Sequence, residues 1–155
     1  MIAVVDSLEI GYDDVGSGIP VLFAHAFPLN RTMWAPNVSA LVDRCRCVAM
    51  DFRGFGETSI TPPYSMEQYA DDLAHLLDVL HIDKVVLVGC SMGGYASFAF
   101  WRRHRDRVRA LVLADTRAGA DSEETIARRR QLIDVAPAQG STAVANAQVS
   151  SLART

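Results

Sequence analysis

The sequence lacks the features that mark membrane-spanning, secreted and nucleic-acid-binding proteins. No apolar run approaches the roughly 20 residues needed to span a bilayer, and the N-terminus has no secretory signal pattern. The formal net charge is −3, which disfavours a protein that coats nucleic acid or an anionic membrane. We therefore expect a cytoplasmic protein that associates with neither nucleic acid nor membrane.

Signatures of metal, redox and nucleotide sites are also missing. Cys45 and Cys47 lack the spacing of a metal or redox pair and are interpreted as core thiols. No Gly-x-Gly-x-x-Gly or Gly-Lys-Ser/Thr pattern occurs, so a phosphate-binding module has little support. We expect no metal site in this chain.

What the sequence does contain is an alternation of short apolar runs with amphipathic segments. With 155 residues, half of them hydrophobic, the chain can bury one sizeable core. Strands that alternate with helices predict an α/β fold, a mostly parallel sheet with helices on both faces. The patterns predict strands at residues 8–13, 21–25, 45–51, 84–88 and 108–115, and helices at residues 30–42, 66–80, 92–104 and 121–134.

Residues 85–94 (Val-Val-Leu-Val-Gly-Cys-Ser-Met-Gly-Gly) have the pattern of a nucleophile elbow. Such a turn holds its serine in strained geometry, and its two glycines let strand and helix approach closely. The N–H groups of a helix that begins at Met92 would stabilise a developing oxyanion beside Ser91. The alternative is a Gly/Ser-rich turn without chemistry. Cys90 fills the variable position of the pattern and is given no role.

Four segments, in the same order along the chain, resemble the α/β-hydrolase family. Residues 25–28 (His-Ala-Phe-Pro) are similar to its His-Gly-x-Pro oxyanion loop, with alanine in place of the glycine. Residues 51–59 are similar to its Asp-x-Arg-Gly-x-Gly-x-Ser loop, residues 89–94 to its elbow, and residues 107–113 to the strand that follows. The group most similar is that of small cofactor-free esterases, enol-lactone hydrolases and perhydrolases, so no cofactor is implied.

The resemblance covers about residues 8–134, which correspond to about the first half of the family's fold. It implies an α/β-hydrolase-like sheet truncated after about the sixth strand and the first cap helices. The core would comprise residues 1–120, and residues 121–155 would start a helical cap segment.

The resemblance also implies catalytic roles. Ser91 would be the nucleophile, and the backbone N–H groups of Phe27 and Met92 would form the oxyanion hole. Asp115 matches a site from which some family members supply the acid of the triad, or else it caps the next turn.

The family's triad histidine has no counterpart here, because no histidine follows His104. A helix that rises about 1.5 Å per residue puts His104 roughly 20 Å from Ser91. The strand before the elbow, at about 3.3 Å per residue, separates it from His75 and His81 by roughly 15–20 Å. His25 alone lies at the correct end of the sheet. In the family this histidine supports the oxyanion loop, and a role as general base stays open.

These observations predict a carboxylic-ester hydrolase that forms an acyl-enzyme on Ser91 from esters, lactones or related acyl compounds, with low or unusual activity. The alternative is a catalytically inactive half-fold that needs a complementing C-terminal half or acts as an oligomeric interaction module. Trp34 and Tyr95 are candidate substrate-binding residues, although each fits the core equally well.

The strand at residues 108–113 would lie at an apolar edge of the truncated sheet, and such an edge favours pairing. We therefore expect a homodimer or higher oligomer, formed by strand pairing or by exchange of the C-terminal helical segment. The expected partners are a small-molecule ester or lactone and a second copy of the chain.

Overall fold

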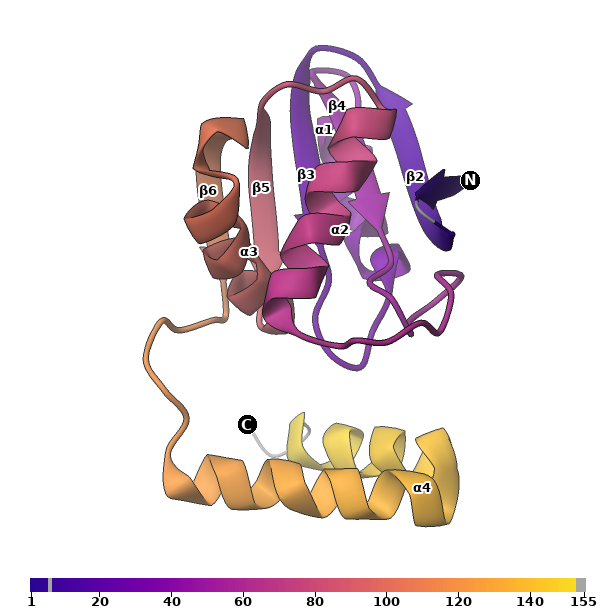
Figure 1. The fold of residues 1–155 in the computed structure, drawn as a ribbon, viewed down its shortest axis with the longest axis vertical. Coiled ribbons are helices and arrows are strands. Elements are labelled where there is room, and N and C mark those ends of the chain that lie inside the picture. The colour runs from indigo at the N-terminus through magenta and orange to yellow at the C-terminus, as the bar shows by residue number, and fades with distance from the viewer. Residues whose placement is uncertain (6, 153–155) are drawn as a thin grey trace. The chain divides into compact units, whose positions relative to one another are not determined.

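A six-stranded sheet forms the centre of residues 1–118, the first of two compact units (Figure 1). The computed structural model describes residues 1–5 and 7–152. The strands are β1 (Ile2–Val5), β2 (Leu8–Gly16), β3 (Ile19–Ala24), β4 (Cys45–Met50), β5 (Val85–Cys90) and β6 (Val108–Ala114). The helices are η1 (Arg31–Trp34), α1 (Ala35–Leu41), α2 (Met66–Val79), α3 (Met92–Arg103), η2 (Arg105–Arg107) and α4 (Glu123–Leu152).

The sheet is mixed, in the order β1-β2-β4-β3-β5-β6. Strands β4, β3, β5 and β6 run parallel, while β2 is antiparallel to both β4 and β1. The predicted α/β class with a mostly parallel sheet is therefore confirmed. The sequence analysis did not predict β1, which pairs with the first half of β2.

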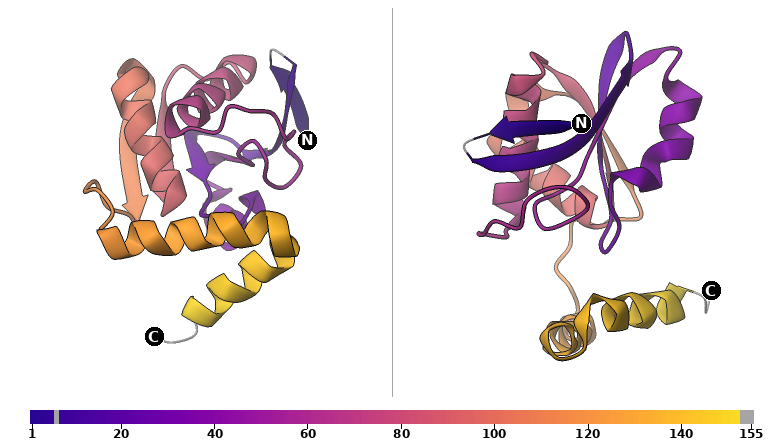
Figure 2. Two further views of the ribbon diagram at one scale, coloured as in Figure 1. Left: turned by 60° about the horizontal axis from the view of Figure 1, so that its bottom comes forward. Right: turned by 90° about the vertical axis from the view of Figure 1, so that its right-hand side faces the viewer.

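Helices cover both faces of this sheet, as Figure 2 shows: α2 and α3 lie on one face and α1 on the other. The larger core cluster lies under α2 and α3, and the smaller one lies under α1. Fully buried members of the larger cluster include Ile10, Leu22, Met50, Leu73, Leu77, Leu87 and Phe100. Because the two clusters pack on opposite faces, the middle strands are apolar on both sides.

The helices begin where local signals predict. The side chain of Asn30 accepts a hydrogen bond from the Thr32 amide at 3.0 Å, and Pro36 stands in the first turn of α1. The segment predicted as one helix at residues 30–42 thus begins with the 3₁₀ turn η1 and continues as α1. Ser65 caps α2 by accepting from the Gln68 amide at 3.0 Å. The Gln68 side chain donates to Asp72 instead, so Ser65 acts here as a simple N-cap.

Residues 119–155 form the second compact unit. Its helix α4 is longer than the predicted helix at residues 121–134, and Gly140, with φ 77° and ψ 176°, divides it into two helical segments. Asp121, ahead of the first segment, pairs with Arg129 at 2.6 Å. Across residues 1–5 and 7–152, none of the helices combines the length and the apolar character needed to cross a membrane.

The edge position of β6 generates the first prediction. This strand ends the sheet order, and Val112 on it is 48% exposed. An edge with free backbone groups and apolar side chains favours pairing with another strand. We expect the 155-residue chain to sediment as a dimer across the micromolar range, and Val112→Lys to shift it toward monomer, since lysine on an edge opposes pairing.

Val79→Lys is the matched control, because Val79 is similarly exposed but lies on α2. A folded chain that sediments as a monomer at every concentration would contradict the expected pairing. If Val112→Lys and Val79→Lys dissociate the dimer equally, the dimer interface is not formed by pairing of β6.

Candidate active site

Ser91 stands between β5 and α3 in a backbone conformation that residues with side chains rarely adopt. Its φ is 50° and its ψ is −109°. The Ser91 N–H donates to the Ala114 carbonyl at 3.0 Å, and the Gly94 N–H donates to the Ser91 carbonyl at 2.9 Å. The serine is therefore held at the tip of a sharp turn by strand β6 on one side and by α3 on the other.

The two glycines of the turn are required by close backbone contacts. A Cβ at Gly89 would lie 2.4 Å from the Gly93 carbonyl oxygen. A Cβ at Gly93 would lie 2.1 Å from the Ala24 carbonyl oxygen and 2.9 Å from that of His25. The first turn of α3 thus lies directly against the end of β3, which any larger residue would prevent.

This contact brings the expected oxyanion donors to one edge of the sheet. Strands β3 and β5 are parallel neighbours, with Ala24 opposite Gly89, so the loop at residues 25–28 and the elbow leave the sheet together. Phe27 lies in that loop, and Met92 is the first residue of α3, where the backbone N–H groups have no intrahelical partner. The two residues that the sequence predicts as oxyanion donors therefore lie at the same edge of the sheet.

His25 is completely buried, and both of its ring nitrogens are engaged. The Phe52 amide donates to Nε2 at 3.0 Å, so Nε2 carries no proton. Nδ1 must then carry the proton, and it lies 3.0 Å from the Ala26 carbonyl oxygen, to which it donates. Burial lowers the pKa of His25, against opposing effects of the Ala26 carbonyl and the nearby Asp51 charge. A general base needs a free acceptor nitrogen, so this geometry does not fit that role and instead makes His25 a support of the loop.

A buried carboxylate ties the loop after β3 to the loop after β4. Asp51 is completely buried and accepts from the Arg31 amide at 2.7 Å and from the Glu57 amide at 2.9 Å. The Arg31 guanidinium contacts Asp51 and Glu57 and donates to Asp13 at 3.1 Å. Gly56, at φ 52°, leaves no room for a Cβ beside the Asp51 carboxylate. The Asp-x-Arg-Gly loop is therefore positioned by Arg31.

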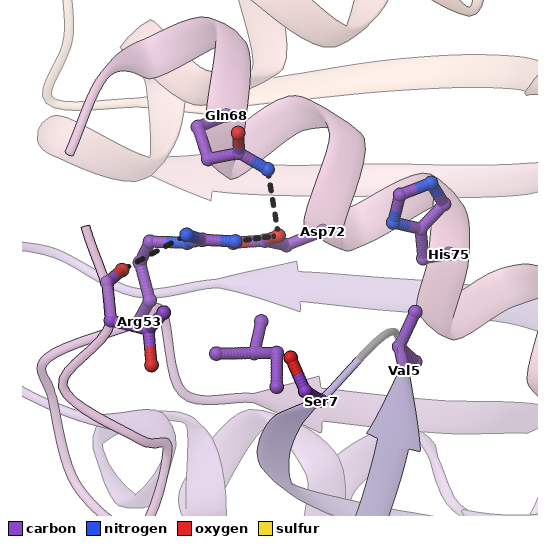
Figure 3. Close-up of a pocket in the computed structure, with 8 residues that line it drawn as sticks. Val5, Ser7, Arg53, Gln68, Asp72 and His75 are labelled. Atoms are coloured by element: carbon purple, nitrogen blue, oxygen red, sulfur yellow. Dashed lines mark hydrogen bonds and ion pairs between the residues drawn. The ribbon is translucent and has the colours of Figure 1, made fainter. Parts of the chain in front are cut away.

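A second buried ion pair joins the same loop to α2 (Figure 3). The Arg53 guanidinium faces the Asp72 carboxylate, with bonds of 2.7 Å and 2.6 Å, and its remaining nitrogen donates to the Thr61 carbonyl at 2.9 Å. The bonds to Asp72 raise the pKa of Arg53, so the guanidinium stays charged despite its burial. Gln68 donates to the same carboxylate from one turn earlier in α2.

Asp115 follows the end of β6 and stands exposed beside the elbow. Its charge, together with the larger effect of burial, raises the pKa of the Cys90 thiol. The expected acid therefore lies near the residue that precedes Ser91. The raised pKa keeps Cys90 in its weakly nucleophilic thiol form.

The other three histidines lie away from the elbow. His104 caps the far end of α3, about 18–20 Å along the helix from Ser91, and its Nε2 is 2.7 Å from the Asp71 carboxylate. His81 is exposed just after α2, and His75 borders the hollow around Arg53 and Asp72 in Figure 3.

The two expected substrate-binding residues differ in environment. Trp34 is buried in the cluster under α1, with its ring centroid 5.2 Å from that of Phe23. This position makes Trp34 a core residue, so its expected contact with substrate does not fit the structure. Tyr95 is half-buried in the first turns of α3, the helix that begins directly after Ser91.

Neither of two hollows in the first unit is lined by Ser91. One, of about 150 Å³, lies between α2 and the β1–β2 turn, beside Arg53 and Asp72 (Figure 3). The other, of about 390 Å³, lies under α1 and is bordered by Arg31 and Val38. In the described part of the chain, no group of three or more histidine, cysteine or acidic residues is placed to hold a metal ion.

Arg31 and Asp72 are positioning residues that the sequence analysis missed. Arg31 stands in the short 3₁₀ turn η1, and Asp72 lies on the amphipathic helix α2. The acidic residue at position 72 falls between buried positions of that face, Tyr69 and Leu73, which is the one local signal of its burial.

Comparisons with known proteins agree with this geometry. A family model described as the alpha/beta hydrolase fold matches residues 19–155. A non-heme chloroperoxidase from Kitasatospora aureofaciens is 41% identical over 111 residues, which are 70% of this chain and 40% of that protein.

Two solved structures also match. A thermophilic esterase from Thermogutta terrifontis is 46% identical, with a TM-score of 0.82, over 86% of this chain and 50% of that chain. An enol-lactonase from Burkholderia xenovorans is 30% identical, with a TM-score of 0.86, over 96% of this chain and 58% of that chain. The chain therefore spans about half the length of these relatives.

The buried, neutral His25 predicts a loss of stability in mild acid. Because its folded-state pKa lies below the ordinary 6.5, the unfolded chain takes up the proton first as pH falls. The stabilising effect is complete above the unfolded pKa and is lost as pH falls toward the folded pKa, with a slope of at most about 1.4 kcal/mol per pH unit. Denaturant unfolding between about pH 8 and pH 5 measures this slope.

His25→Asn should flatten that part of the profile. His81→Asn, at an exposed histidine, is the matched control and should keep the wild-type profile. If the wild type and His25→Asn lose stability with the same slope, His25 is not held neutral by the fold.

Proposed function

Because this chain belongs to the α/β-hydrolase fold family, we propose that it carries the nucleophile and oxyanion hole of a serine hydrolase acting on carboxylic esters, lactones or related acyl compounds. The observation that carries the proposal is the strained Ser91, at φ 50° and ψ −109°, between a buried strand and the start of α3. Strain of this kind costs on the order of 1–3 kcal/mol and is found where function requires it.

The first chemical step is attack of Ser91 Oγ on the acyl carbonyl carbon. The Met92 and Phe27 N–H groups stabilise the negative charge on the carbonyl oxygen, and each such donor is worth on the order of 2.7–4 kcal/mol. The bond to the leaving group then breaks and leaves an ester on Ser91, which water hydrolyses in a second step. A serine at this position favours acyl transfer over displacement by a carboxylate, and the esterase and enol-lactonase relatives are named for acyl substrates.

Among the described side chains, none is placed to accept the serine proton, so in this proposal the proton passes to solvent water and the leaving group departs as its anion. His25 has both nitrogens engaged, and the other histidines lie away from the elbow. Asp115 is proposed as the acid beside the site, where it would orient a base. Without a base the activity is low. It is not zero, because an oxyanion hole and substrate binding alone still accelerate acyl transfer by roughly 10³–10⁴-fold over water. Substrates with good leaving groups are therefore favoured.

The occupied nitrogens of His25 also favour a second candidate, a catalytically inactive half-fold. Such a chain would keep the elbow as structure and would need a complementing segment to supply the base. The two candidates differ in whether Ser91 can be acylated by an activated ester.

The deciding experiment is a pre-steady-state reaction of the purified chain with p-nitrophenyl acetate, followed by intact-mass and peptide-mapping mass spectrometry. We expect a burst of nitrophenolate that approaches about one equivalent per chain, with an acetyl group on Ser91. Ser91→Ala should abolish the burst. Cys90→Ser is the matched control for the neighbouring thiol and should keep it.

The fate of the adduct separates the candidates. An adduct on Ser91 that clears with turnover supports a working hydrolase, and one that persists shows that deacylation lacks its base. If the wild type forms no adduct and reacts at the same rate as Ser91→Ala, the proposed chemistry is overturned. The inactive half-fold is then the remaining candidate.

A further inference from the structure

Two residues at the end of β6 form hydrogen bonds with the backbone of Ser91. The Ser91 N–H donates to the Ala114 carbonyl at 3.0 Å. Two residues later, the Thr116 hydroxyl donates to the Ser91 carbonyl oxygen, also at 3.0 Å. Both polar groups of this strained residue are therefore bound by one short segment of the neighbouring strand end.

The residue between them explains how one segment reaches the serine twice. Asp115 has a φ of 45°, in the left-handed region that residues other than glycine seldom occupy. This conformation ends β6 and turns the chain back toward the elbow, so that both Ala114 and Thr116 face Ser91. An extended residue at position 115 would carry Thr116 onward along the strand direction.

Gly94 shows that the elbow is shaped to receive Thr116. A Cβ at position 94 would lie 2.4 Å from Thr116 Oγ1 and 2.6 Å from Thr116 Cβ, both closer than atoms pack. The Gly-x-Ser-x-Gly pattern accounts for Gly89 and Gly93 but makes no demand on residue 94. The space left by this third glycine is filled by the threonine side chain.

We propose that Thr116 is a positioning residue that sets the direction of the Met92 N–H in the oxyanion hole. The inference rests on the proposed function of Ser91. The Ser91 carbonyl and the Met92 N–H belong to one planar peptide unit, in which they point in opposite directions. The Ser91 carbonyl oxygen accepts from the Gly94 and Tyr95 amides, at 2.9 Å and 3.3 Å, as well as from the Thr116 hydroxyl. The hydroxyl is the donor among these that comes from outside α3, and by restraining the carbonyl oxygen it also restrains the N–H that faces the developing oxyanion. Because this donor acts on charge that appears only in the transition state, Thr116 affects the rate of acylation and leaves substrate binding unchanged.

The test compares Thr116→Val with Thr116→Ser. Valine keeps the shape beside Gly94 and removes the hydroxyl, whereas serine keeps the hydroxyl and removes the methyl group. Stopped-flow acylation of each full chain by p-nitrophenyl acetate gives the saturating rate and the half-saturation concentration separately. We expect Thr116→Val to lower the saturating rate about 3- to 10-fold, the effect of one net hydrogen bond, with the half-saturation concentration unchanged. Thr116→Ser should retain most of the rate.

Gly94→Ala tests the same contact from the other side. Its methyl group would displace the Thr116 side chain, so the saturating rate should fall in the same way as in Thr116→Val. Amide hydrogen exchange at Ser91 and Gly94 provides a readout that needs no activity. Exchange should quicken in Thr116→Val and stay near wild type in Thr116→Ser.

The outcomes distinguish this inference from the proposed function. If the wild type acquires no Ser91 adduct, the proposed function fails and hydrogen exchange alone decides whether Thr116 holds the elbow. If the wild type is acylated and Thr116→Val matches it in rate and exchange, the inference is overturned while the function stands. A rate that falls only in proportion to lost folded protein, or a change confined to the half-saturation concentration, also overturns it.

Discussion

The first turn of α3 lies so close to the end of β3 that residue 93 has no room for a side chain. A Cβ there would stand 2.1 Å from the Ala24 carbonyl oxygen. Because β3 and β5 are parallel neighbours, this approach joins the serine turn to the loop that follows β3. The two N–H groups that we propose as the oxyanion hole, those of Phe27 and Met92, therefore belong to adjacent elements at one edge of the sheet. The proposed site is thus assembled mainly from backbone, and Gly93 permits the close approach.

The loop that carries Phe27 is also held by contacts with the loop after β4, which do not involve the elbow. His25 accepts from the Phe52 amide, and Arg31 reaches the buried Asp51, so the chain on both sides of Phe27 is bonded to the loop after β4. That loop is in turn bonded to α2 through Arg53. Buried ion pairs contribute little net stability, but removal of one partner leaves a costly unpaired charge. Here the two pairs tie the loop after β4 to Arg31 and to α2, and the oxyanion hole that we propose would need such a fixed loop.

Local signals in the sequence account for the fold class, for most of the elements and for the elbow, but not for β1 or the length of α4. Contacts between distant residues do not follow from them. The unit of β5, turn and α3 is contiguous, so its residue types and spacing reveal it. The contacts that Arg31 makes with Asp51, and Thr116 with Ser91, join residues 20 and 25 positions apart. A threonine after a strand end has the same sequence pattern whether it faces solvent or a catalytic turn. The left-handed Asp115 directs it to the turn. Aspartate occupies that region more often than most residues do, but it is far commoner in other conformations, so its presence does not predict the turn.

His25 is buried and hydrogen-bonded, so it supports the loop but is unsuited to accept a proton during catalysis. A general base must accept a proton and carry the resulting positive charge while the reaction proceeds. His25 is buried, with a lowered pKa, and its acceptor nitrogen is already bound to the Phe52 amide. Gaining a proton there would break that bond and place a charge in the core. Oxyanion stabilisation and proton transfer are therefore separable in this fold. The first, as proposed, would arise from neighbouring backbone segments of one sheet edge. The second requires a base that none of the described side chains at that edge provides.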